Sequence, residues 1–84
     1  MKPIRFSGHA NEQMIERGAS EAEVIGAIRD GERAPAKQGR QGFRRNYPYG
    51  SMWGGRVYAI KQVFAIVAEE PDVLVVVTVY TYYF

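Results

Sequence analysis

The side chains that could carry chemistry in this chain are one histidine, a set of arginines and lysines, and several tyrosines. The 84 residues include 1 His and 0 Cys, which excludes a thiolate nucleophile, a disulfide and an ordinary zinc site. His9 is the one side chain that titrates near neutral pH without perturbation, so it is the candidate acid or base. We therefore expect neither a metal nor a cofactor.

Metal-independent cleavage of RNA is the reaction that these residue types could support. It needs a base for the 2′-hydroxyl proton, an acid for the leaving 5′ oxygen and cations beside the phosphorane. His9 could act as base or acid, and Arg17, two turns further along the same helix stripe, could bind the phosphate. Tyr80 or Tyr82 could donate a proton or stack a base. We expect Thr78 and Tyr80 to face the side of the last strand that the helices cover.

Each of these residues also has a purely structural reading. His9 could bond a backbone carbonyl or pack on the sheet, and Thr78 could make a cross-strand hydrogen bond. Arg17 lies where a helix C-terminus would be, and the helix dipole favours a cation there whatever the function.

Positive charge is concentrated in the middle of the chain. The net charge is only +2, but no Asp or Glu occurs between residues 33 and 68. A positive face of this kind attracts RNA or an acidic partner protein, although it could also be a solvated surface without a ligand. We expect one sheet face to bind RNA through four of the basic residues in this span: Arg40, Arg44, Arg45 and Lys61.

Two helices are predicted in the first third of the chain. Ser7 is a typical N-cap for a helix from Gly8 to Arg17, and Gly18 is a typical C-terminal stop. Ser20 and Glu23 have the spacing of a capping box, which predicts a second helix that ends near residue 31.

The strands are predicted from β-branched and aromatic runs. Ile4–Phe6 is a short strand, and 32–38 is a short edge strand or a loop. Strands are also expected at 41–49, 56–68 and 73–84, with a turn at 51–55 and a hairpin connection at 69–72. Residues 73–84 carry apolar side chains at alternate positions on both faces, as in a central strand or a C-terminal strand that closes a sheet. Trp53, in the turn, either anchors a partner or covers the end of the core.

The element order predicts an α+β fold: a short N-terminal strand and two helices packed on one face of a three- to four-stranded antiparallel sheet. Residues 1–84 make a single domain with one core. The start of the chain has no apolar run typical of a signal peptide, and the C-terminal run is too short and too β-branched for a membrane helix. We expect a cytoplasmic protein with no membrane segment.

Three motifs resemble the bacterial family called domain of unknown function 4258: FSGHA at 6–10, MIERGAS at 14–20 and VTVY at 77–80. That family is similar to the RelE/ParE-like toxins, whose superfamily includes barnase-like ribonucleases. The resemblance implies a βααβββ fold, metal-independent RNA cleavage, and an antitoxin or immunity protein as partner. The residues that match its motif positions are His9, Arg17, Thr78 and Tyr80. Gln13 stands where a basic residue is common, which would weaken a site that depends on that charge.

The sequence leaves three function classes open. The first is a toxin of a toxin–antitoxin or competition system that acts as an endoribonuclease. The second is a non-catalytic RelE/ParE-like module that binds an acidic partner or nucleic acid. The third is a dimerisation domain, in which the aromatic C-terminal stretch holds two copies together.

Overall fold

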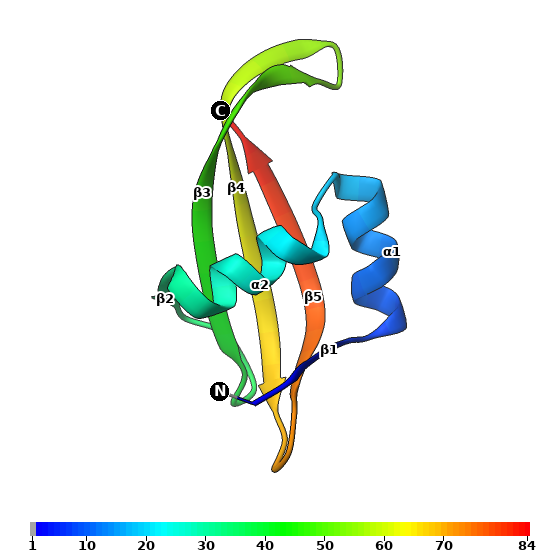
Figure 1. Cartoon of the computed structure of the whole chain (residues 1–84), viewed down its shortest axis with the longest axis vertical. Helices are drawn as coiled ribbons and strands as arrows, with labels where there is room; N and C mark the ends of the chain where they lie inside the picture. The colour runs from blue at the N-terminus through cyan, green and yellow to red at the C-terminus, as the bar shows by residue number, and fades with distance from the viewer. Residues whose placement is uncertain (1) are drawn as a thin grey trace.

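The computed structural model describes residues 2–84 as two helices and a five-stranded sheet (Figure 1). The elements are β1 (Ile4–Phe6), α1 (Gly8–Arg17), α2 (Glu21–Asp30), β2 (Glu32–Ala34), β3 (Gln41–Trp53), β4 (Arg56–Glu69) and β5 (Leu74–Tyr83). The strand order is β1-β5-β4-β3-β2. Within the described residues, no helix is long and apolar enough to cross a membrane.

The predicted α+β class is confirmed, but the predicted sheet is wrong in detail. β1 pairs with β5 in parallel, and β2 forms a fifth strand antiparallel to β3, so the sheet is mixed. Both additional pairings are short, three residues on each side, and they lie at the sheet edges. The two helices carry the chain across one face to the opposite edge of the sheet, and the antiparallel strands β3, β4 and β5 bring it back, so the last strand ends up beside β1.

Local hydrogen bonds fix the ends of both helices where the sequence predicts them. The Ser7 hydroxyl accepts from the N–H of Ala10, and Gly18 ends α1 in the left-handed conformation at φ 75°. Ser20 and Glu23 form a complete capping box at the start of α2. Each cap satisfies helix-end groups that would otherwise lack a partner.

Both helices cover one face of the sheet, as predicted. In Figure 1, α2 crosses in front of β3, β4 and β5, whereas α1 lies beside β5. The core lies between these two layers and is aliphatic apart from Phe43 and Met14. Its fully buried side chains include Val24 from α2, Val63 and Val67 from β4, and Val76 and Val79 from β5.

A β-bulge in β5 changes which residues face the helices. Ile66 pairs with Thr78, but Val67 pairs with Val76, so Val77 is an extra residue in the ladder. Leu74, Val76 and Val79 consequently belong to the core. Strict alternation would have put Leu74, Val76, Thr78 and Tyr80 on one face, and that prediction is wrong.

The hairpin formed by β3 and β4 is longer than predicted and folds back onto the end of the core. β3 continues to Trp53, past a register shift between Pro48 and Ser51, so the predicted turn at 51–55 is mostly strand. The Trp53 ring stacks on Tyr83, with centroids 4.8 Å apart, and touches the end of α1 at Gly18. A Cβ at Gly18 would lie 2.7 Å from the Trp53 ring. Trp53 therefore covers the end of the core.

Candidate functional site

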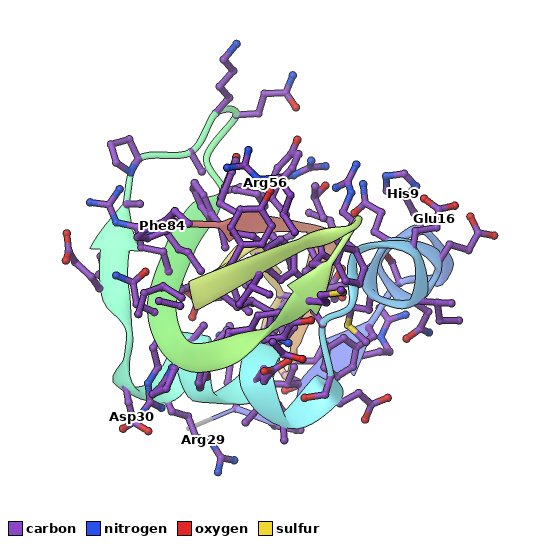
Figure 2. All side chains as sticks on the ribbon, turned by 90° about the horizontal axis from the view of Figure 1, so that it is seen from above. His9, Glu16, Arg29, Asp30, Arg56 and Phe84 are labelled. Carbon is purple, nitrogen blue, oxygen red and sulfur yellow. The ribbon has the colours of Figure 1, made fainter. Side chains whose placement is uncertain are left out.

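The face of the sheet away from the helices is called the open face below. The strand pairing identifies its residues. They pair with one another across neighbouring strands, and along each strand they alternate with the residues that face the core. They are Arg44 and Asn46 on β3, Gln62, Phe64 and Ile66 on β4, and Thr78, Tyr80 and Tyr82 on β5. Figure 2 shows α2 on one side of the strands and the connection between β2 and β3 on the other.

A cavity of about 350 Å³ opens between that connection and the open face. Thr78, Tyr80 and Ile66 form its floor, and two cations, Lys37 and Arg40, belong to its wall. The remaining lining residues are Pro35, Ala36 and Gln38. Within residues 2–84, neither Lys37 nor Arg40 forms an ion pair. The same cavity is therefore lined by two cations without acidic partners, by the hydroxyl-bearing Thr78 and by the phenol-bearing Tyr80.

A tight turn holds the two cations of the cavity close in sequence and space. The N–H of Arg40 donates to the carbonyl oxygen of Lys37 at 3.1 Å. Both central residues have positive φ, 60° at Gln38 and 72° at Gly39, as in a type I′ turn. Gln38 is the one described non-glycine residue with positive φ. Such a conformation costs about 1–3 kcal/mol, so the rest of the loop must hold it in place.

Side chains of α1 protect the edge of β5 where β1 has ended. The side-chain oxygen of Gln13 accepts from the N–H of Val79 at 2.8 Å, and the Arg17 guanidinium donates to the carbonyl of Val79 at 2.6 Å. These two side chains replace the hydrogen bonds that a longer β1 would have made. Gln13, where the family pattern often has a basic residue, is therefore a buried structural partner of the sheet.

Arg17 and Tyr80, two of the predicted catalytic residues, come together at this edge. The Arg17 guanidinium carbon lies 5.1 Å from the centroid of the Tyr80 ring, within cation–π range. The Thr81 and Tyr83 hydroxyls donate to the Arg17 carbonyl and fix the end of α1. Arg17 thus reaches around the edge of the sheet toward the open face.

Thr78 and Tyr80 lie on the open face, so the expectation that the helices cover them is wrong. The bulge at Val77 is the reason, because it moves both residues to the opposite side. No hydrogen bond joins the Thr78 hydroxyl to another described side chain or backbone group. Both residues line the cavity, and their predicted catalytic role stays a prediction.

His9 lies on the exposed surface of α1 and does not line the cavity. It has no hydrogen bond or ion pair within residues 2–84, so nothing there supports its structural reading. The N–H of Ser7 donates to Val76, and Gln13 reaches Val79, so α1 runs alongside β5. His9 is therefore level with the bulge beside Thr78, about 12 Å along the helix axis from Arg17. Figure 2 shows its side chain pointing toward the side of the β2–β3 connection.

The four cations predicted to bind RNA do not share a face, so the expectation of one common face is wrong, while their role in RNA binding stays a prediction. Arg40 lines the cavity, and Arg44 lies on the open face with its guanidinium 2.8 Å from Glu32. Arg45 points to the helix side, 3.6 Å from Asp30, because adjacent residues of a strand face opposite ways. Lys61 is only 7 % exposed, also on the helix side.

Lys61 holds the two helices to the sheet. Its ammonium donates to the carbonyl of Gly18 and to the carboxylate of Glu23, both at 2.8 Å. Burial alone would raise the pKa of the Glu23 carboxyl, but the hydrogen bonds from Lys61 and Ser20 and the charge of Lys61 outweigh it. The pKa of Glu23 is therefore lowered. Lys61 is a structural residue.

Sequence reasoning missed Lys37 as a member of the site. Lys37 was visible as one cation of the acid-free span, but nothing in its own spacing marked it. The signal that could have found it is Gln38-Gly39, a pair that favours a tight turn and brings the residues on either side together. Within the described chain, no group of three or more His, Cys, Asp or Glu could hold a metal ion.

A comparison with protein-family models identifies the family of the chain. The model of DUF4258, described as a domain of unknown function, matches residues 6–81. The matched segment contains the three sequence motifs, both helices and nearly all of β5. Comparison with curated proteins and with solved structures finds no match. Because the model covers most of the 84 residues, the chain belongs to the DUF4258 family.

Proposed function

We propose that the protein binds RNA on its open face and cleaves it without a metal ion, as the toxin of a bacterial toxin–antitoxin or competition system. The observation that carries the proposal is the cavity, where Lys37 and Arg40 stand beside Thr78 and Tyr80. Two cations without acidic partners suit a phosphate, which carries the negative charge that the site lacks. A volume of about 350 Å³ has room for a phosphate with its ribose.

The cleavage chemistry fits the edge of β5. The 2′-oxygen attacks phosphorus as its proton passes to the His9 imidazole, and the bond to the 5′ oxygen breaks as Tyr80 gives that oxygen a proton. The products are a 2′,3′-cyclic phosphate and a 5′-hydroxyl. Arg17, already against the Tyr80 ring, neutralises charge on the non-bridging oxygens. His9 is exposed on α1, so this step requires its side chain to turn toward the bound phosphate.

The partner in this proposal is an acidic antitoxin or immunity protein. The sequence motifs led us to expect such a partner, and the charge of the cavity is the observation that supports it. A partner that inserts a carboxylate between Lys37 and Arg40 would pair both cations and block the phosphate position.

A second candidate, a binding module without catalysis, is favoured by one observation. His9, the candidate acid or base, is outside the cavity lining. The two candidates share the RNA-binding surface and differ only in whether the bound strand is cut.

The test is incubation of the purified protein with 5′-labelled RNA in excess chelator. We expect cyclic-phosphate products, and a fall in rate of about 10²- to 10⁴-fold for His9→Ala with an unchanged melting temperature. Intact RNA that remains bound would refute cleavage and leave the binding module.

Salt dependence tests the phosphate site itself. Each phosphate neutralised on a single strand contributes about −0.7 to the slope of log K against log salt, so Lys37→Ala with Arg40→Ala, which removes both cations from one phosphate, should flatten the slope by about 0.7. The matched control is Arg29→Ala, an exposed arginine on α2, which Figure 2 places on the other side of the sheet. If both variants bind RNA with the wild-type slope, the cavity is not the phosphate site.

A further inference from the structure

Aromatic side chains continue from the cavity along the open face of β5, and one more follows directly after the strand. Tyr80, Tyr82 and Phe84 alternate in sequence and are 39 %, 48 % and 57 % exposed, respectively. We call these three residues the aromatic row. Tyr80 belongs both to the row and to the cavity lining, so the two features form one continuous surface.

The tyrosines of the row differ from those used by the fold. Tyr47 donates its hydroxyl to the carbonyl of Glu23, and Tyr83 donates to that of Arg17. No such bond to another described residue is made by Tyr80 or Tyr82. A single exposed ring needs no explanation, but several neighbouring rings that adjoin a charged cavity are typical of a binding site, so the row points to a ligand.

Neighbouring groups hold the rings in position before any ligand arrives. The Tyr80 and Tyr82 rings are nearly parallel, with centroids 6.5 Å apart and planes 23° from each other. Phe64 contacts Tyr80 edge-on at 6.2 Å, and the Arg17 guanidinium lies 5.1 Å from the same ring. Phe84 is anchored by two backbone hydrogen bonds to Ile60. A platform fixed in this way loses little conformational entropy on binding.

We propose that the aromatic row stacks the bases of an unpaired RNA strand whose phosphate lies between Lys37 and Arg40. This inference rests on the proposed RNA binding and adds the form of RNA that is bound. Same-face residues of a strand are about 6.5–7 Å apart, which gives successive bases successive rings. Base faces are exposed in a single strand and covered in a duplex, so the row selects unpaired RNA.

The charge beside the row favours RNA over an apolar protein surface. An apolar protein surface would cover the rings but leave Lys37 and Arg40 without counter-charges. A nucleotide strand supplies an anion and a flat ring at each repeat. The surface has cations in the cavity and exposed rings in the aromatic row that continues from it, so it offers both kinds of contact that a nucleotide strand needs.

Binding to 2′-O-methyl RNA tests the inference, because this strand lacks the attacking hydroxyl and cannot be cleaved. We expect Tyr80→Leu and Tyr82→Leu each to weaken binding of a single-stranded octamer by about 5- to 100-fold. Tyr82→Phe keeps the ring and removes a hydroxyl that has no assigned role, so this variant should bind as the wild type does. An octamer with two abasic sites should bind the wild-type protein more weakly than the intact octamer does. The wild-type protein and the Leu variants should then bind this abasic strand with equal affinity.

The outcomes separate this inference from the proposed function. If the Leu variants bind normally and abasic strands bind as tightly as intact ones, stacking is refuted. In that case, weaker RNA binding by Lys37→Ala with Arg40→Ala would still support the proposed RNA-binding function. If neither intact RNA nor abasic RNA binds the wild type, both proposals fail. Equal affinity for an octamer and its duplex would also overturn the selection of unpaired RNA.

Discussion

The two faces of the sheet use the same residue types in opposite ways. On the helix side, Lys61 and Tyr83 are fully engaged with helix-end carbonyls, and Lys61 also pairs with Glu23. On the open face, Lys37 and Tyr82 have no such partners within the described chain. The helix side therefore shows polar groups that the fold requires, and the open face shows polar groups that the fold leaves available. Whether a side chain has a hydrogen-bond or ion-pair partner within the described chain, more than its residue type, separates structural residues from candidate functional residues.

The sharpest test of this contrast is the comparison of two lysines. Lys61→Met removes the partner of a partly buried carboxylate and of the Gly18 carbonyl, so we expect a loss of about 3 kcal/mol in the free energy of unfolding. Lys37→Met, on the exposed loop, should change it by less than about 0.5 kcal/mol. Urea unfolding of both variants gives the two values. Equal effects would remove the distinction between the faces.

Two tyrosines provide a smaller test of the same idea. Tyr83→Phe leaves the ring on Trp53 but removes a hydrogen bond to the Arg17 carbonyl, which should cost about 1 kcal/mol. Tyr82→Phe removes a hydroxyl without such a bond and should be close to neutral. Thermal unfolding compares them. A loss in Tyr82→Phe as large as that in Tyr83→Phe would mean that the Tyr82 hydroxyl supports the fold.

Acid should weaken the helix side in a way that depends on Glu23. Its pKa in the folded protein lies below the ordinary value of 4.5, so the stability it contributes is present above that pH and is lost as the pH falls through the folded-state pKa. The effect is the smallest of the three because burial opposes the lowering. The free energy of unfolding, measured between pH 7 and pH 3, should fall less steeply in Glu23→Gln than in the wild type. Parallel curves would show that the pair with Lys61 does not govern acid sensitivity.

The elements that could be predicted from the sequence are those fixed by nearby residues. Ser7, Gly18 and the Ser20–Glu23 pair define the helix ends through bonds that span a few residues. The parallel pairing of β1 with β5 joins Ile4 to Leu74, and no local pattern records a contact of that range. It depends on how two whole helices pack.

The site was predicted in part for the same reason. Arg17 and Tyr80 were selected from their types and do meet, but their face could not be deduced, because one extra residue at Val77 reverses the alternation. Regular alternation along β4 places Lys61 on the same face as Val63, but its burial depends on Glu23 and Gly18, which come from distant segments. Whether a cation is free or paired is a tertiary property.

The contact of Trp53 with Tyr83 and Gly18 gives the protein a built-in optical reporter of folding. The chain has 1 Trp, and it lies where the end of α1, the tip of the β3–β4 hairpin and the last strand converge. Forming the hairpin alone would leave the indole without Tyr83 and Gly18 around it. Intrinsic fluorescence in a stopped-flow experiment therefore follows the docking of the hairpin tip against the last strand and the end of α1, which are contacts between distant segments and belong to the slow part of folding.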